Sequence, residues 1–198
     1  MNYFAHLFFS EPTLESRVGH LLGDFSRGVD RATLDPEMAR ALAQHHWIDR
    51  FTDSHPEVQC ARELFSRQRR RFSGVALDVL FDHFLLNDWA LYAWSDQDLY
   101  IDTLYRDLLE ARPLMPLSMK KVTARVVGED WFRAYRSLET VNFALDRIAA
   151  RIRFPNKFAG VGREIEQHYE QLHGHFKAFF PELLSSYRNV WQYNVTKT

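Results

Sequence analysis

Cysteine is almost absent from this chain, and with it any disulfide framework. Cys60 is the only cysteine among 198 residues, so the sequence offers neither an internal disulfide nor a cysteine-based zinc site. Such a composition is typical of a protein that stays in a reducing compartment. We therefore expect a cytoplasmic location.

A long hydrophobic run is missing as well. A helix that spans a bilayer needs about 20 apolar residues, and no segment of the chain approaches that length. Residues 1–10 are apolar, but they have neither a basic leading segment nor a small-residue cleavage site. We expect a soluble, unexported protein with no membrane partner.

Neither sign of charge is in excess. The chain has 25 lysines and arginines against 26 aspartates and glutamates, which gives a formal net charge of −1. A general nucleic-acid binder carries a large basic excess, so we expect no nucleic-acid partner. Any electrostatic recognition must be confined to a local surface.

Strand-forming patterns are scarce too. The sequence has no sustained alternation of apolar and polar residues and no Asn-Gly or Asp-Gly hairpin signal. It also has no internal repeat, low-complexity tract or long linker that would mark a second domain. With 46% apolar residues, the chain can bury a sizeable core. These features predict an all-α protein whose residues 1–198 form a single compact multi-helix domain.

Helical signals dominate what is present. Asp35, Pro36 and Glu37 provide a capping residue, a first helical residue and an early acid, which predict a helix running to about Thr52. Pro56 predicts the start of a new helix that extends towards Arg70. Further helices are predicted over residues 75–94, 98–111, 118–127, 138–151 and 162–179, and Pro181 is expected to open a last helix that frays over residues 194–198.

Residues 45–55 hold the strongest single pattern of metal-ligand side chains. On a helix, steps of four residues keep His45, Asp49 and Asp53 on one broad face. One imidazole and two carboxylates that converge there are suitable ligands for a divalent cation. The alternative is a surface helix whose acids pair with neighbouring arginines, and spacing alone favours neither interpretation.

Residues 78–85 form a second pattern, in which acids interrupt an apolar helix. An ionised Asp82 buried there needs a cation, an arginine or several hydrogen-bond donors, which favours a metal site. His83 points about 100° away from Asp82, so one of the two can bind metal while the other orients a ligand or transfers a proton. Asp78, one turn earlier, has a supporting or surface role in this interpretation.

Residues 19–28 form a third pattern, in which glycines flank Asp24. It predicts a helix end where the backbone and a carboxylate approach a ligand closely, although an ordinary helix C-terminus explains the spacing more simply. His6 is a lone histidine in an apolar segment, which is typical of a hydrogen-bonded core residue.

These patterns, read together, resemble the acyl carrier protein phosphodiesterase family. The resemblance rests on residues 1–7, 19–25, 45–53 and 78–85 in this order and spacing, and it continues more weakly through residues 131–135 and the helix near His168. The chain departs from the family at His20, where relatives usually have asparagine. It also departs at His46 and Trp47, which replace an arginine-containing pair.

The resemblance implies a divergent HD-type metal-dependent phosphohydrolase. Its implied reaction hydrolyses the phosphodiester that links 4'-phosphopantetheine to a serine of holo acyl carrier protein, giving the apo form. The implied cofactor is a divalent metal, Mn²⁺ first and Mg²⁺ second. On this basis the expected metal ligands are Asp24, His45, Asp82 and His6, with Asp49 and His83 as catalytic or supporting groups and His83 as the proton donor.

A local basic run suits an acidic carrier protein as the substrate. It comprises Arg62, Arg67, Arg69, Arg70 and Arg71, of which Arg70 and Arg71 are the expected substrate contacts. A solvated charge run explains the same residues equally well. Two other functions stay open at this point: an HD-type phosphohydrolase acting on a nucleotide or another small phosphodiester, and a non-enzymatic helical adaptor whose His/Asp cluster is structural.

Overall fold

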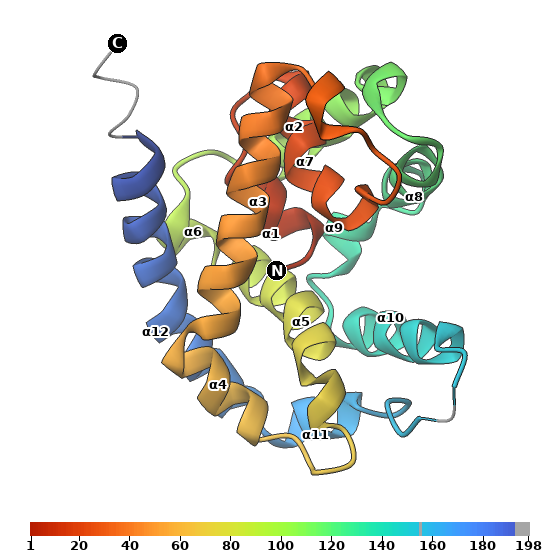
Figure 1. Ribbon diagram of the computed structural model, residues 1–198. Helices are drawn as coiled ribbons and strands as arrows, with labels where there is room; N and C mark the ends of the chain where they lie inside the picture. The colour runs from red at the N-terminus through yellow and green to blue at the C-terminus, as the bar shows by residue number, and fades with distance from the viewer. Residues whose placement is uncertain (155, 193–198) are drawn as a thin grey trace. The chain divides into compact units, whose positions relative to one another are not determined.

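The computed structural model describes residues 1–154 and 156–192, and these residues form helices without any strand (Figure 1). The prediction of an all-α protein is therefore confirmed. The expected fraying of residues 194–198 lies outside the described residues. Within the described ranges, no helix combines the length and the apolar character that crossing a membrane requires.

Helices of very different lengths follow one another along the chain. The α-helices are α1 (Tyr3–Phe8), α2 (Leu14–Leu22), α3 (Pro36–Ser54), α4 (Pro56–Glu63), α5 (Ser73–Asn87), α6 (Trp89–Tyr92), α7 (Gln97–Glu110), α8 (Leu117–Gly128), α9 (Trp131–Ala134), α10 (Leu138–Arg151), α11 (Gly162–Gln167) and α12 (Tyr169–Tyr187). Short 3₁₀ turns are η1 (Gly23–Phe25), η2 (Arg31–Thr33), η3 (Arg70–Phe72) and η4 (Arg112–Leu114), and a π-helical turn η5 (Arg188–Gln192) follows α12.

The chain groups into two compact units. Unit 1 comprises Met1, Ile48–Phe84 and the described residues from Ser137 onward, and unit 2 comprises Asn2–Trp47 and Leu85–Arg136. Helices α3 and α5 each contribute residues to both units. A single domain over the whole chain stays a prediction.

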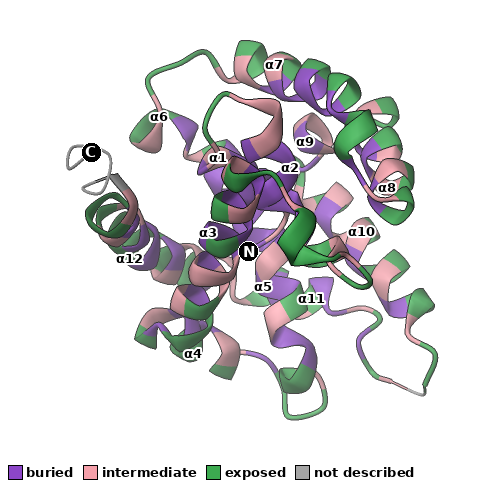
Figure 2. Ribbon diagram, turned by 45° about the horizontal axis from the view of Figure 1, so that its top comes forward, coloured by how far each residue is buried: buried purple, intermediate pink, exposed green. Residues whose placement is uncertain are grey.

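Unit 2 is built around the buried helix α2, which Figure 2 shows covered along most of its length. Gly19 allows the close approach of α2 to α3, because a Cβ there would lie 2.5 Å from the carbonyl oxygen of Met38. Arg17 is buried and is held by Asp107, 3.5 Å away, and by the carbonyl of Leu7 at 3.1 Å. This packing fixes the last turn of α2, which carries His20.

Unit 1 is held together by the packing of α12 against α4 and α5. The ring of Phe81 on α5 lies 5.3 Å from that of Phe176 and 5.6 Å from that of Phe179 on α12. Helix α4 runs beside α12 (Figure 1), and the His175 ring lies 2.7 Å from a carboxylate oxygen of Glu57. The apolar helix α5, which carries Asp82 and His83, is thereby buried.

The predicted helix starts agree with the observed caps. Asp35 accepts a hydrogen bond from the amide of Glu37 at 2.8 Å, and Pro36 is the first residue of α3. His55 caps α4 by accepting from the amide of Glu57. The end of α3 lies within two residues of the prediction.

Helix α4 is shorter than predicted, since it ends at Glu63 and not near Arg70. Tertiary hydrogen bonds hold the following residues out of a helix. The amide of Ser66 donates to a carboxylate oxygen of Glu164 at 2.9 Å, and Arg69 donates to the carbonyl of Lys157 at 2.9 Å. These contacts are distant in sequence, so local propensity did not reveal them.

The helix predicted over residues 75–94 is broken into α5 and α6. The Gln97 side chain donates to the carbonyl of Leu86 at 2.5 Å, and so satisfies a carbonyl at the end of α5. The indole of Trp89 donates to the carbonyl of Ser95 at 2.8 Å and stabilises the following turn.

The C-terminal prediction was wrong at two points. The helix predicted over residues 162–179 is interrupted at His168, and Pro181 lies inside α12 and does not open a new helix. Proline removes one helical hydrogen bond. That loss is offset because the neighbouring side chains of Phe179, Phe180 and Leu183 are completely buried.

Candidate metal centre

The imidazole of His45, on α3, has a fixed orientation. Its Nδ1 lies 2.7 Å from the carbonyl oxygen of His20, so Nδ1 carries a proton and donates it. The lone pair of the neutral ring is then on Nε2. A hydrogen bond from one ring nitrogen to a carbonyl is the usual way in which a protein prepares the other nitrogen to bind metal.

Gly23, at the start of η1, packs directly against this imidazole. A Cβ at this position would lie 2.0 Å from both Nε2 and Cδ2 of His45, so only glycine fits. The sequence predicted a close backbone approach near Asp24, and the structure shows that the backbone approaches the His45 ring.

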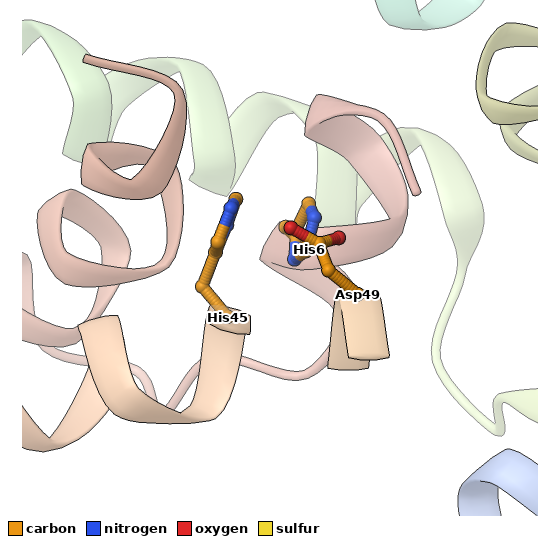
Figure 3. A group of neighbouring side chains, drawn as sticks. All are labelled: His6, His45 and Asp49. Atoms are coloured by element: carbon orange, nitrogen blue, oxygen red, sulfur yellow. The ribbon is translucent and has the colours of Figure 1, made fainter. Parts of the chain in front are cut away.

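His6 and Asp49 complete a group of three possible ligands with His45. The His6 ring, fully buried on α1, stacks on that of His45 with centroids 3.8 Å apart and planes 19° apart. One ligand atom from each of His6, His45 and Asp49 lies within 4.8 Å of the others. Figure 3 shows His45 and Asp49 projecting from successive turns of α3, with His6 beside them.

This donor set fits a divalent first-row transition metal. Two imidazoles and one carboxylate are ligands that Mn²⁺, Fe²⁺ and Zn²⁺ accept. The shared face of His45 and Asp49 was predicted from the four-residue spacing. The participation of His6 was expected only from the family resemblance.

His20 is a neighbour of the group that His6, His45 and Asp49 form. It is completely buried, and its Nε2 lies 3.2 Å from the side-chain oxygen of Gln44. Burial lowers the pKa of His20 well below its ordinary value, and the neighbouring His6 and His45 lower it further. A neutral His20 adds no positive charge beside a site that suits a cation.

A buried ammonium lies among three carboxylates in unit 1. The amino group of Met1 is 2.8 Å from Asp78 and 3.5 Å from Asp49. Burial alone would lower the pKa of this amino group, but Asp78 and Asp49, with a further contribution from Asp82, outweigh burial and raise it to about 10. Asp82 itself is completely buried. Asp82 was predicted to need a cation, an arginine or hydrogen-bond donors, and the Met1 ammonium supplies positive charge to it.

The remaining predicted ligands lie outside the group of three. Asp24 is exposed on η1, directly after Gly23, and Asp82 is buried on α5. Among the described residues, neither belongs to the group that His6, His45 and Asp49 form. Asp53 forms an ion pair of 2.5 Å with Arg62, so for this acid the surface-pair interpretation is the right one.

His83 has a partner that the sequence did not reveal. Its Nε2 lies 2.9 Å from the hydroxyl of Tyr169, which opens α12 and is 86 positions away along the chain. The His83 side chain is buried, so this hydrogen bond fixes the orientation of the ring. No local pattern around Tyr169 indicates this role.

The two arginines expected to contact substrate are both exposed. Arg70 donates to the carbonyl of Glu63 at 3.1 Å, and the guanidinium of Arg71 lies over the rings of Phe72 and Phe154. Arg62 and Arg69, from the same run, are instead engaged in ion pairs with Asp53 and Glu164.

Comparison with known proteins places the chain in a family. The family model described as acyl carrier protein phosphodiesterase matches residues 1–183. The chain belongs to the acyl carrier protein phosphodiesterase family. It is 34% identical over 186 residues to an acyl carrier protein phosphodiesterase of Yersinia enterocolitica, covering 93% of this chain and 96% of the relative.

Further members of the acyl carrier protein phosphodiesterase family show similar identity. The proteins of that name from Serratia proteamaculans and Escherichia coli O6:H1 are each 30% identical, over 185 and 186 residues, again with 93% of this chain and 96% of the relative covered. No solved structure matches the chain. Its likeness to the HD-type phosphohydrolases therefore stays a prediction from the sequence.

Proposed function

We propose that this protein hydrolyses the phosphodiester between 4'-phosphopantetheine and a serine of holo acyl carrier protein, and that it does so in the cytoplasm as a single domain. The observation that carries the proposal is the group formed by His6, His45 and Asp49 in a chain that the family model matches along residues 1–183. The hydrogen bond from Nδ1 of His45 to a carbonyl leaves Nε2 as the nitrogen that can bind a metal, which supports an enzymatic site over a structural adaptor.

The proposed cofactor is Mn²⁺, with Mg²⁺ as the second choice. His45, His6 and Asp49 would hold it, and Asp24 and Asp82 are the further ligands that we propose from the sequence. When bound, such a metal neutralises charge on the phosphoryl oxygens and lowers the pKa of water. Two imidazoles among the ligands favour a transition metal over Mg²⁺, which prefers carboxylates and water.

His83 is the proposed proton donor. In the hydrolysis a water molecule adds to phosphorus and releases one proton to the solvent, and the bond from phosphorus to the serine oxygen breaks. The serine oxygen must take up a proton because an alkoxide is a poor leaving group. The hydroxyl of Tyr169, 2.9 Å from Nε2 of His83, would hold the ring in position for this transfer.

A comparison of cleavage rates for different substrates tests the proposed reaction. Purified protein with Mn²⁺ should release phosphopantetheine from holo carrier protein much faster than it cleaves cyclic nucleotides or bis(p-nitrophenyl) phosphate, as followed by chromatography of the products. Faster cleavage of a nucleotide would support the small-phosphodiester alternative. No cleavage of any ester with Mn²⁺, Mg²⁺ or Zn²⁺ would leave the adaptor as the correct interpretation.

A further inference from the structure

Two segments of unit 1 that are far apart in sequence form one surface. Arg69, in the segment 66–72, donates to the carbonyls of Lys157 and Ala159, each at 2.9 Å, and pairs with Glu164 at 2.7 Å. These bonds hold Lys157 and the chain that follows it beside the segment 66–72. The guanidinium of Arg69 is therefore engaged in contacts within the protein, and we do not count it among the groups that contact a partner.

Stacked aromatic rings support the same junction. The Phe72 ring lies 5.3 Å from that of Phe158, which is completely buried, and 6.3 Å from that of Phe154, which is 48% exposed. The guanidinium of Arg71 lies 4.9 Å and 5.1 Å from the centroids of Phe72 and Phe154. The stacked rings of Phe72, Phe154 and Phe158 thus form an apolar cluster, and the charged group of Arg71 lies on it.

The charge of the two segments is strongly one-sided. Residues 66–72 and 151–157 contain seven lysines and arginines and no acid, although the whole chain has a net charge of −1. The rest of the chain therefore carries a net charge of −8. Apart from Arg69 all of these cations are exposed, and we call them the basic surface: Arg67, Arg70, Arg71, Arg151, Arg153 and Lys157.

We propose that the basic surface, with the exposed ring of Phe154 as an apolar anchor, is the docking site for an acidic protein, the carrier protein of the proposed reaction. This inference rests on the proposed function, and it goes beyond the pair Arg70 and Arg71 by adding Arg151, Arg153, Phe154 and Lys157. A local patch of six exposed cations attracts an acidic protein at long range and orients it before close contact.

An acidic protein fits this surface better than a nucleic acid or a lipid bilayer does. A polyanion much larger than the patch would also be repelled by the rest of the chain, which carries a net charge of −8. The exposed Phe154 beside Arg71 is the kind of aromatic and arginine pair that protein interfaces favour.

Arg153 and Lys157 allow a test that leaves the packing intact. Both side chains are exposed, and Lys157 contacts Arg69 only through its backbone carbonyl. The test variant is the double charge reversal Arg153→Glu with Lys157→Glu. The matched control reverses two exposed cations of unit 2, Arg112→Glu with Lys121→Glu.

Steady-state kinetics with holo carrier protein should separate the two variants. At about 20 mM salt the test variant should show a KM roughly tenfold higher and an unchanged kcat, while the control keeps the wild-type KM. The difference should shrink at about 300 mM salt. Both variants should cleave bis(p-nitrophenyl) phosphate at the wild-type rate, which shows that the chemistry is intact.

The docking proposal and the reaction fail in distinguishable ways. If the wild type does not act on carrier protein, the reaction is wrong. If the wild type acts on it but the test variant keeps the wild-type KM at low salt, the docking site is wrong. Binding of the wild type, but not of the test variant, to single-stranded DNA or to phosphatidylglycerol vesicles, with an unchanged KM for carrier protein, would assign the surface to that other partner and would also overturn the proposal.

Discussion

At the scale of single residues, three neighbours determine how His45 lies. The carbonyl of His20 accepts its Nδ1 proton, His6 stacks on its ring, and Gly23 packs against it. Contacts from α1, α2 and η1 therefore set the orientation of the His45 ring. Such preorganisation reduces the cost of binding a metal.

Gly23→Ala tests this arrangement. The added methyl group would lie 2.0 Å from Nε2 and Cδ2 of His45 and must displace the ring. We expect Mn²⁺ affinity, measured by isothermal titration calorimetry, to fall by about tenfold or more, as for loss of a supporting contact to a metal ligand. Gly174→Ala is the control, because nothing lies within 4 Å of the added methyl group. If both variants bind Mn²⁺ like the wild type, the packing of Gly23 has no role in the site.

Removal of the proposed ligands should have a graded effect. His45→Ala, Asp24→Ala and Asp82→Ala should nearly abolish turnover and reduce bound metal, because each removes a proposed donor to the cation. Asp78→Asn should keep most of the activity, since Asp78 contacts the Met1 ammonium at 2.8 Å and not the group of three. Metal content and circular dichroism must be measured together. Folded variants of the first three that keep both metal and turnover would contradict the ligand assignment.

Tyr169→Phe tests the contact that the sequence did not reveal. The substitution removes only the hydroxyl that lies 2.9 Å from His83. Loss of one hydrogen bond should lower kcat roughly three- to tenfold, with metal content unchanged, because Tyr169 acts through the proposed proton donor. A kcat equal to that of the wild type would show that the orientation of His83 does not limit the reaction.

Spacing predicted part of the site, and long-range packing determined the rest. The four-residue step from His45 to Asp49 was enough to place both on one face of α3. His6 and Tyr169 come from helices distant in sequence, so no local pattern brings them to their partners. The Met1 ammonium was also missed, since a chain terminus gives no side-chain signal.

At the scale of elements, one carboxylate joins α11 to the segment after α4. Glu164 accepts from the amide of Ser66 and pairs with Arg69. Burial alone would raise the pKa of Glu164, but the Ser66 amide and the Arg69 guanidinium outweigh burial and hold it below its usual value. Arg69 also contacts Lys157, so this junction lies next to the basic surface.

The lowered pKa of Glu164 has a defined consequence for stability. A carboxyl group with a depressed pKa in the folded state contributes stability above its unfolded pKa, near 4.3, and that contribution is lost as pH falls through the folded pKa. Glu164→Gln should therefore lower the melting temperature by a few degrees at pH 7, and the difference from the wild type should shrink as the pH falls below about 4.

Glu166→Gln is the matched control for this measurement. Glu166 accepts a hydrogen bond from Asn142 at 2.7 Å, and glutamine retains an acceptor oxygen for it. Its melting temperature should stay close to that of the wild type. A Glu164→Gln variant that melts like the wild type at pH 7 would show that the junction contributes no stability.

The same elements show where sequence prediction succeeds and fails. Caps such as Asp35 and His55 act within one turn, so helix starts were predicted well. Helix ends depended on partners far along the chain, as at Ser66 with Glu164 and at Leu86 with Gln97. Pro181 lies inside α12 because burial of its neighbours outweighs the lost hydrogen bond.

At the scale of the whole molecule, amino-acid composition excluded classes of protein but did not predict the basic surface. The net charge of −1 gives no sign of the seven cations in residues 66–72 and 151–157, because these two segments come together only in the folded chain. The all-helical fold followed from periodicity. The family followed from the combination of several modest motifs, and the match over residues 1–183 then confirmed it.

Intact-protein mass spectrometry of holo carrier protein tests the central claim most directly. Carrier protein is incubated with the wild type or with His45→Ala, in Mn²⁺ or in excess chelator, and its mass is then measured. The wild type with Mn²⁺ should convert the carrier protein to the mass of its apo form, and the other three combinations should leave it at the holo mass. Holo protein that persists with the wild type and Mn²⁺, or apo protein that forms in the chelator, would contradict metal-dependent removal of phosphopantetheine.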